Sequence, residues 1–129
     1  MNSTEILGEK GLLSQVIEGF TPREPQQKMA AAVEKTLELD SQLVIEAGTG
    51  TGKTFGYLIP IFLQQKKTII STGTKNLQDQ LFFNDIPVVK KILPFPIKVV
   101  LLKGRANYLC KQRLERNIED GRFISRQVV

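Results

Sequence analysis

Short apolar runs alternate with longer stretches of helical periodicity along this chain. The runs cover residues 43–45, 68–72 and 99–102, and each has the length of a buried strand. Apolar side chains recur at helical spacing at residues 55–63 and again from about Thr74. Because parallel strands joined by a helix form a right-handed crossover, the pattern predicts an α/β fold with a parallel sheet and flanking helices.

A long helix is predicted to begin at Thr21 and to end near Leu39. Thr21 supplies a hydroxyl cap, Pro22 takes the first helical position, and Glu24 follows three residues after the cap. One face of this helix should be buried, and it includes an amide side chain that needs a hydrogen-bond partner there. The buried face comprises Gln26, Met29, Val33 and Leu37.

Shorter helices are predicted elsewhere. Residues 1–20 are weakly patterned, with one short amphipathic helix indicated before Gly19 by Leu12, Leu13, Val16 and Ile17. Pro60 lacks an N–H and presses on the preceding turn, so we expect a kink or an early end of the helix that contains it. After the second apolar run, a helix should carry Leu77 and Leu81 inward, and another is expected around residues 88–93.

A phosphate-binding loop motif stands between the first apolar run and the helix that follows. Its glycines allow unusual backbone conformations and leave the N–H groups open to a polyphosphate. Lys53 adds a charge for the outer phosphates, Thr54 offers a hydroxyl to magnesium, and the helix dipole favours the same anion. A glycine-rich turn that binds nothing is the alternative. The expected ATP-binding loop residues are Ala47, Gly48, Thr49, Gly50, Thr51, Gly52, Lys53 and Thr54, with Lys53 and Thr54 as catalytic candidates.

Composition is that of a soluble globular domain. The chain has 129 residues, of which 41% are hydrophobic and 24% charged, so disordered and fibrous classes are excluded. No apolar run approaches the roughly 18 residues of a membrane span, and the first twenty positions do not resemble a signal peptide. The single cysteine, Cys110, cannot form an internal disulfide. We therefore expect a cytoplasmic protein with no membrane contact.

Charge is distributed unevenly along the chain. Residues 1–63 carry five basic and eight acidic side chains, whereas residues 64–129 carry thirteen basic and five acidic ones. The basic C-terminal half suits a polyanion, and nucleic acid is the leading candidate because phosphate contacts supply most non-specific affinity. A solvated basic surface is the alternative.

Four motifs, taken in order, resemble a known family. They are Gly19-Phe20-Thr21-Pro22-Arg23 with Gln26, the loop continuing through Thr54-Phe55-Gly56-Tyr57-Leu58-Ile59-Pro60, the segment 72–81, and Lys103-Gly104-Arg105-Ala106-Asn107-Tyr108-Leu109-Cys110. Together they resemble the iron–sulfur, XPD-like superfamily 2 DNA helicases of bacteria, of the DinG and YoaA type and nearer to YoaA. The resemblance covers about residues 18–114. It implies a RecA-like first motor domain, of which residues 1–129 would be an incomplete N-terminal portion that ends inside the iron–sulfur insertion.

The resemblance also implies residue roles. Gln26, with Arg23 nearby, would read adenine, and Lys53 and Thr54 would hold phosphate and magnesium. A glutamine bonded within its own helix end is the alternative for Gln26. Residues 72–78 would contact single-stranded DNA, because their hydroxyls, lysine and helix N-terminus favour phosphate. For Thr74, ordinary capping of the helix is the alternative. The implied DNA-binding residues are Thr72, Thr74, Lys75 and Gln78.

Cys110 matches the first of four cysteines that hold a [4Fe–4S] cluster in this family. Such a cluster needs about four thiolates, and the sequence has a single one, so no cluster is expected in this chain alone. Without the resemblance, Cys110 would be interpreted as a lone buried cysteine. Two further parts of the family's machinery are not found in this sequence: the acidic motif that orients water, and the second motor domain. ATP turnover is therefore not expected from these residues alone.

The sequence leaves three functional hypotheses open. The preferred one is part of an ATP-dependent DNA helicase that uses ATP and magnesium. The alternative is a non-catalytic module that binds nucleotide and nucleic acid. A small nucleotide kinase shares the loop, but no acceptor site can be located in the sequence. The sequence does not identify any protein partner.

Overall fold

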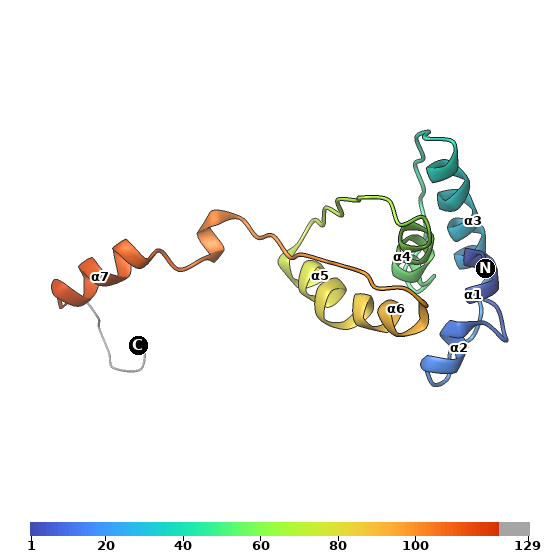
Figure 1. Cartoon of the computed structure of the whole chain (residues 1–129), viewed down its shortest axis with the longest axis horizontal. Coiled ribbons are helices and arrows are strands. Elements are labelled where there is room, and N and C mark those ends of the chain that lie inside the picture. Colours follow the sequence, from blue (N-terminus) through green and yellow to red (C-terminus); the bar gives the residue numbers. More distant parts are fainter. Residues whose placement is uncertain (122–129) are drawn as a thin grey trace. The chain divides into compact units, whose positions relative to one another are not determined.

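The computed structural model describes residues 1–121. It divides into two units, the first from Met1 to Lys98 and the second from Val99 onward, and each is described by itself. The first unit contains α1 (Ser3–Ile6), α2 (Leu12–Val16), α3 (Glu24–Glu38), α4 (Lys53–Leu63), α5 (Lys75–Gln80), the π-helix η1 (Leu81–Asp85) and α6 (Ile86–Ile92) (Figure 1). The second contains the 3₁₀ turn η2 (Arg105–Asn107) and α7 (Lys111–Glu119).

The expected parallel sheet is not formed within residues 1–121. Residues 43–45, 68–72 and 99–102 have no regular secondary structure, and no β-ladder joins them. Several of their apolar side chains face solvent: Val44 is 97% exposed and Ile69 is 94% exposed. A strand is stable only when a neighbour pairs with its N–H and C=O groups, and two or three short strands are marginal by themselves. The prediction of three buried strands is therefore wrong for this structure.

The core of the first unit is built by helices. Helix α3 packs along α4, α1 contacts both, and α6 packs against α2 and α4. Burying the apolar stripes of these helices supplies the main driving force for folding of this unit. The apolar side chains with an exposed fraction of zero are Leu7, Leu13, Ala30, Leu58, Ile59 and Val89.

Helix α3 begins two residues later than the sequence predicts, counted from N-cap to N-cap. Its N-cap is Arg23, which makes no side-chain capping hydrogen bond, and Pro25 lies in its first turn. If Thr21 were the N-cap, the first intrahelical hydrogen bond would run from the N–H of residue 25 to the Thr21 carbonyl. Pro25 has no N–H, so this bond could not form. Starting at Glu24 puts this proline where no such bond is needed. The predicted end near Leu39 is confirmed, since Leu39 is the C-cap.

The buried face of α3 differs from the predicted stripe. Gln26 is 3% exposed and Ala30 fully buried, one turn apart. The three apolar side chains of the predicted stripe are only partly buried, so that part of the prediction is wrong. They are Met29, Val33 and Leu37.

Other helix predictions have mixed outcomes. The short helix predicted before Gly19 is confirmed as α2, and residues 1–20 contain a second one, α1, that was not predicted. Helix α4 continues past Pro60 to Leu63, so an early end there is wrong. Leu81 is buried as predicted, but Leu77 is 40% exposed. The helix expected around residues 88–93 begins earlier, at Ile86, and ends at Ile92.

One continuous helical stretch, made of α5, η1 and α6, contains a π-helical turn in its middle. The π turn ends at Asp85, and Pro87 lies in the first turn of α6. Pro87 cannot donate to the turn before it, and its ring would press on a carbonyl there. A wider turn relieves this conflict, which accounts for the position of the π-helix.

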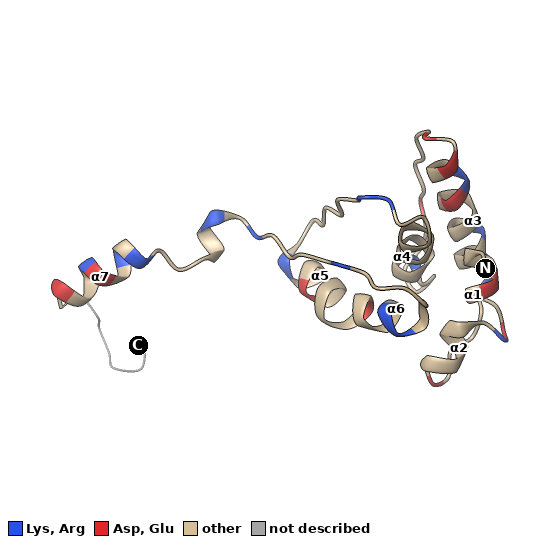
Figure 2. Ribbon diagram, viewed as in Figure 1, with Lys and Arg blue, Asp and Glu red and all other residues tan. Residues whose placement is uncertain are grey.

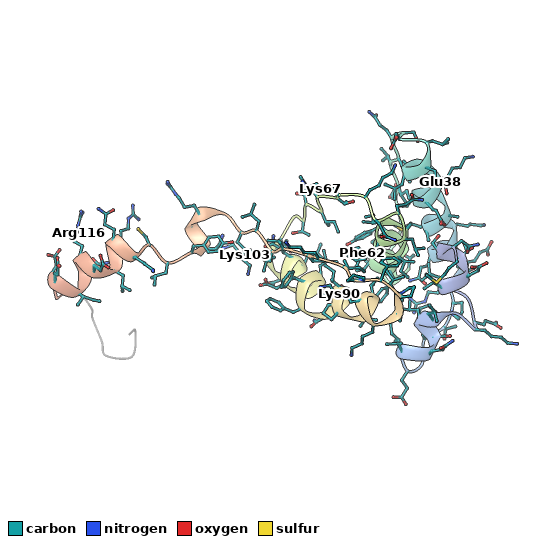
Figure 3. The ribbon with its side chains drawn as sticks, viewed as in Figure 1. Glu38, Phe62, Lys67, Lys90, Lys103 and Arg116 are labelled. Atoms are coloured by element: carbon teal, nitrogen blue, oxygen red, sulfur yellow. The ribbon has the colours of Figure 1, made fainter. Side chains whose placement is uncertain are left out.

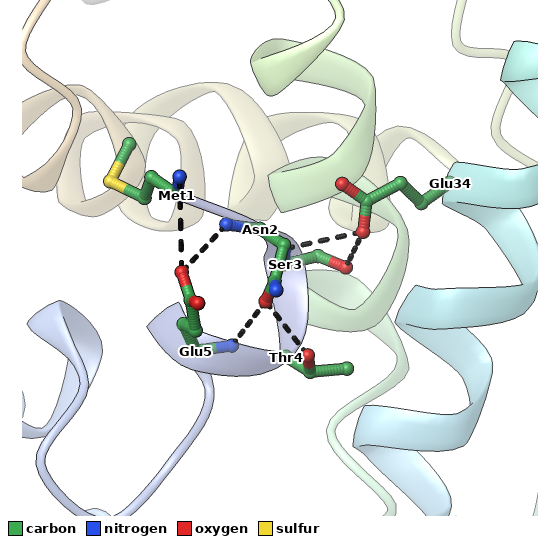
Figure 4. A network of polar contacts seen from close by, with 6 residues as sticks. All are labelled: Met1, Asn2, Ser3, Thr4, Glu5 and Glu34. Atoms are coloured by element: carbon green, nitrogen blue, oxygen red, sulfur yellow. Dashed lines mark hydrogen bonds and ion pairs between the residues drawn. The ribbon is translucent and has the colours of Figure 1, made fainter.

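The N-terminal helices are fastened to α3 by polar contacts (Figure 4). Asn2 and Glu5 form a reciprocal capping box at the start of α1. The Ser3 hydroxyl and backbone N–H both donate to Glu34 on α3, and Ser3 is fully buried. The Gln27 amide donates to the Leu7 carbonyl at 3.1 Å. These contacts hold α3 in place, and with it the side chains near its N-terminus.

Within residues 1–121, no helix is both long enough and apolar enough to cross a membrane.

Replacing Leu58 with alanine should lower the free energy of unfolding by about 2–5 kcal/mol, because Leu58 is fully buried and alanine leaves a cavity. Val44→Ala should change that free energy by less than about 0.5 kcal/mol, since Val44 is exposed. Urea denaturation of the 129-residue chain measures both. Similar losses in the two variants would show that residues 43–45 are buried after all.

Candidate nucleotide-binding site

The phosphate loop closes directly onto the first turn of α4. Gly52 is the N-cap residue in the left-handed conformation, with φ of 76° and ψ of 31°, and Gly50 has a φ of 77°. Side chains strain this backbone conformation, so glycine is favoured at both positions. A Cβ atom at Gly52 would also lie 2.2 Å from Nε2 of Gln26. A side chain at this junction with α4 would therefore have to displace the Gln26 amide.

Lys53, the first residue of α4, folds its side chain back across the loop. Its ammonium group donates to the carbonyl of Ala47 at 2.9 Å and to that of Gly48 at 2.6 Å. The hydroxyl of Thr51 donates to the same Gly48 carbonyl at 3.0 Å. The lysine charge is thus held beside the loop backbone, where an anion bound by the loop would meet it.

Two side chains from the start of α3 hold the loop from the other side. Arg23 donates through Nη1 to the carbonyl of Gly50, and Gln26 donates through Nε2 to the carbonyl of Gly52 at 2.9 Å. The structure thus brings Arg23 and Gln26 to the loop, although 26 residues separate Gln26 from Gly52. The alternative in which the Gln26 amide bonds within its own helix end is wrong.

The buried Gln26 side chain has one acceptor left over. Its Oε1 is buried and has no hydrogen-bond partner among the described residues. An unpaired buried carbonyl oxygen is costly, and such atoms usually meet a donor in the functional state. A donor group on a ligand would satisfy it.

The loop geometry fits a polyphosphate. A Cβ atom built at Gly48 or Gly50 would meet no atom within 4 Å, so the loop is open on that side. Helix α4 spans eleven residues and starts at the loop, so its unpaired N–H groups and dipole favour an anion there. Lys53 could hold the outer phosphates, and Thr54 could supply a hydroxyl to magnesium.

Tyr57 and Asp85 extend the site toward the π-helix, and the sequence predictions did not include them. Burial raises the pKa of Tyr57, a hydrogen bond with the Thr54 side chain lowers it, and the nearby Asp85 carboxylate raises it further. Burial also raises the pKa of Asp85, while a hydrogen bond from Gln80 lowers it. Helical spacing, three residues after Thr54, could have pointed to Tyr57. Nothing local marks Asp85.

The predicted DNA-binding residues lie close together at the start of α5. The Thr74 hydroxyl accepts from the Leu77 N–H at 3.2 Å, so Thr74 is a helix cap as the alternative predicted. The Thr72 hydroxyl donates to the Thr74 carbonyl at 3.2 Å. Lys75 is exposed and Gln78 partly buried. DNA contact by these residues stays a prediction.

Cys110 belongs to the second unit, where it is exposed and is the N-cap residue of α7. The interpretation of a lone buried cysteine is therefore wrong. In the described part of the chain, no group of three or more His, Cys, Asp or Glu side chains could hold a metal ion. The nearby Tyr108 hydroxyl accepts from the Lys103 N–H at 3.0 Å and so fixes this turn.

Basic side chains are frequent in the C-terminal half of the described residues (Figure 2). Lys67 and Lys90 belong to the first unit, and Lys103 and Arg116 to the second (Figure 3). Acidic residues occur on α3 and the turn after it, where the sequence has Glu34, Glu38 and Asp40, and also on α7. Basic side chains therefore occur on both units of the described residues.

Comparison with known proteins decides the family. A model described as DEAD/DEAH box helicase matches residues 23–118, which include the loop and the segment at the start of α5. The chain belongs to the DEAD/DEAH box helicase family. This membership implies a RecA-like α/β fold, although the sheet of that fold is not formed in residues 1–121. No solved structure matches the chain.

Curated relatives extend this family assignment. The chain is 60% identical over 116 residues to ATP-dependent DNA helicase YoaA of Haemophilus influenzae, covering 90% of this chain and 18% of that protein. It is 50% identical over 126 residues to YoaA of Escherichia coli K12, covering 98% and 20%. It is 44% identical over 108 residues to ATP-dependent DNA helicase DinG of E. coli K12, covering 79% and 15%. The resemblance to YoaA and DinG is confirmed, and the chain spans about a fifth of the YoaA proteins it matches.

Gly52→Ala should lower the free energy of unfolding by about 1–3 kcal/mol, because alanine is strained at positive φ and its Cβ would strike Gln26. Gly48→Ala is the matched control, since its added Cβ meets nothing within 4 Å and its φ is not positive. Chemical denaturation without nucleotide measures both. Equal effects in the two variants would contradict the contact between Gln26 and Gly52.

Asp85→Asn should raise the melting temperature at neutral pH. The pKa of Asp85 is higher in the folded state than its ordinary value of 3.8, so ionisation disfavours folding as pH rises through the folded-state pKa. The gain over the wild type should therefore disappear as pH falls below about 3.8.

Asp40→Asn is the control of opposite sign for that experiment. Lys66 lowers the pKa of Asp40 through a hydrogen bond of 2.9 Å and its charge. This carboxylate therefore favours folding at neutral pH, and the benefit is lost as pH falls through the lowered pKa. Scanning fluorimetry at several pH values measures both differences, and a fall in the melting temperature of Asp85→Asn at neutral pH would contradict the assignment.

Proposed function

We propose that this chain is the N-terminal part of the first motor domain of an ATP-dependent DNA helicase. The observation that carries the proposal is the phosphate loop, in which Gly50 and Gly52 take left-handed conformations and Lys53 reaches over the loop from the start of α4. The relatives that bear this activity in their names support it. Because the chain spans only about a fifth of the YoaA proteins, unwinding is a property we propose for the complete protein.

Nucleotide binding would use both the loop and the start of α3. The loop N–H groups and Lys53 would hold the phosphates, and Thr54 would hold magnesium, which neutralises charge on the outer phosphates when bound. Adenine carries an exocyclic amine, and the unpaired Oε1 of Gln26 is an acceptor for such a donor. Arg23 is held beside it by its bond to the loop. Reading of adenine by Gln26 and Arg23 is therefore part of the proposal.

Single-stranded DNA is the proposed second ligand. Thr72, Thr74, Lys75 and Gln78 lie within one short stretch and supply hydroxyl, ammonium and amide groups suited to phosphate and sugar. The excess of lysine and arginine after residue 63 would add sequence-independent attraction to the backbone.

An iron–sulfur cluster does not fit this chain. Cys110 is exposed and could be one ligand, but it is the single cysteine of the sequence and a [4Fe–4S] cluster needs about four thiolates. We derive no step through a cluster. The single cysteine also agrees with a cytoplasmic location, which we propose on this ground.

ATP hydrolysis distinguishes the helicase from the alternative, a non-catalytic module that binds nucleotide and nucleic acid. Phosphoryl transfer in such motors needs an acid that orients water and an arginine from a second domain, and neither motif is recognised here. We therefore propose that the chain binds ATP and DNA without steady turnover by itself. Steady phosphate release from the 129-residue chain would overturn that statement, and binding without release in the complete protein would favour the non-catalytic module.

Lys53→Ala should weaken the binding of a fluorescent ATP analogue in the presence of magnesium by at least about tenfold, because a charge-assisted contact worth about 1.5–3 kcal/mol is lost. Binding of labelled single-stranded DNA should change by less than about twofold, since Lys53 lies at the loop. Lys67→Ala, an exposed lysine away from the loop, is the matched control. Fluorescence anisotropy measures both affinities, and unchanged nucleotide affinity in Lys53→Ala would refute the site.

A further inference from the structure

The π-helix η1 presents two side chains to solvent. The N–H of Ile86 donates to the carbonyl of Leu81, five residues earlier, which is the bond that defines a π turn. One π turn therefore separates Leu81 from Ile86, and both lie on the buried side of the helical stretch. Phe83 and Asn84 lie between them and are exposed, Phe83 by 62%. The π turn thus turns an aromatic ring and an amide away from the core.

The Phe83 side chain lines a shallow pocket of about 520 Å³. This size admits a small organic group. Apart from the Phe83 ring, every side chain that lines the pocket is an amide or a carboxylate, so polar groups surround a single aromatic surface. The lining residues are Asn76, Asp79, Gln80, Phe83, Asn84 and Asp85.

A neighbouring aromatic side chain fixes the Phe83 ring. Phe82, which is partly buried, packs against it edge to face, with ring centroids 5.1 Å apart and an interplanar angle of 86°. In such an arrangement Phe82 can cover no more than one face of the Phe83 ring. The remaining surface is open, as the exposure of Phe83 shows. An aromatic ring held in this way is a platform on which a flat ring system can stack.

The pocket begins within the proposed DNA-binding segment, residues 72–78. Asn76 lines the pocket and directly follows the exposed Lys75, while Phe83 lies about two helical turns further along the same stretch. The rise from Lys75 to Phe83 is roughly 12 Å, which is the length of about three to four stacked nucleotides. A strand whose phosphate meets Lys75 can therefore place a nearby base against Phe83.

The charges of the pocket favour a base over a phosphate. Asp79 and Asp85 line it, and like charges repel, so the DNA backbone is excluded from the pocket and stays on the side of Lys75. Carboxylate oxygens accept hydrogen bonds from the exocyclic amines of bases. The amides of Asn76 and Asn84 each offer donors and an acceptor to a base edge. The pocket therefore fits a flat, uncharged group with polar edges, which describes a nucleobase.

We propose that this pocket binds one base of single-stranded DNA and that Phe83 stacks on that base. This inference rests on the proposed function, because it adds a base contact to the backbone contacts of residues 72–78. Stacking itself tolerates every base, since all bases have a flat aromatic face. The contact strengthens DNA binding without strict dependence on sequence.

An abasic strand separates base stacking from backbone contact. The 129-residue chain is titrated with labelled oligodeoxythymidine and with an oligonucleotide of equal length that has abasic sugars throughout, and fluorescence anisotropy gives both affinities. The wild type should bind oligodeoxythymidine at least about fivefold more tightly, because one stacked base contributes about that factor. Phe83→Ala should remove this preference by lowering the affinity for oligodeoxythymidine at least about fivefold, while the affinity for the abasic strand changes by less than about twofold.

Two further variants test the aromatic character of the contact. Phe83→Leu keeps an apolar side chain without a ring and should lose affinity as Phe83→Ala does. Phe83→Tyr keeps the ring and should stay within about twofold of the wild type. Leu39→Ala is the matched control, since Leu39 is an apolar residue at the end of α3 that is 65% exposed. Urea denaturation and binding of the fluorescent ATP analogue show that each variant is folded.

The outcomes separate this inference from the proposed function. If Phe83→Ala binds oligodeoxythymidine as tightly as the wild type does, or binds both strands more weakly by the same factor, the stacking role is overturned and DNA binding by residues 72–78 is kept. Equal affinity of the wild type for the two strands would overturn the stacking role as well. If a wild type that binds the ATP analogue binds neither strand, the proposed DNA binding fails and this inference fails with it.

Discussion

The contact between Gln26 and Gly52 is the constraint on which the site depends. It joins α3 to the first turn of α4, and it requires both a glycine with positive φ and a buried amide beneath it. The packing of α3 on α4, and the fastening of α1 to α3 through Ser3 and Glu34, keep this amide in place. The loop is thereby held by the fold rather than by its own residues alone, which is the preorganisation that anion binding needs.

Loop and helix features could be predicted because they depend on nearby residues. The glycines, Lys53 and Thr54 form a local pattern between an apolar run and an apolar helix, and the structure places Lys53 at the start of α4. The end of α3 near Leu39 was predictable for the same reason. The start of α3 was predicted wrongly because Thr21 offered a good cap, whereas the missing N–H of Pro25 decides where the helix begins.

Features that depend on distant partners could not be predicted in this way. The sequence indicated that Gln26 needed a partner, but it could not show that this partner is the Gly52 carbonyl. The three apolar runs have strand composition, yet a strand also needs a neighbour with which to pair, and residues 43–45 remain exposed here. The π-helical turn that ends at Asp85 has Pro87 as its local signal, but the packing of this turn against α4 depends on residues far away in the sequence.

The central claim is that the loop at the start of α4 binds the phosphates of a nucleotide. The most direct measurement is a titration of the isotopically labelled chain with magnesium and ATP, followed by the backbone amide signals in nuclear magnetic resonance spectra. The account predicts saturable shifts that are largest at Gly48, Gly50, Gly52 and Lys53, because these N–H groups would face the phosphates. Unmoved loop signals in a folded sample, or shifts confined to other residues, would contradict it.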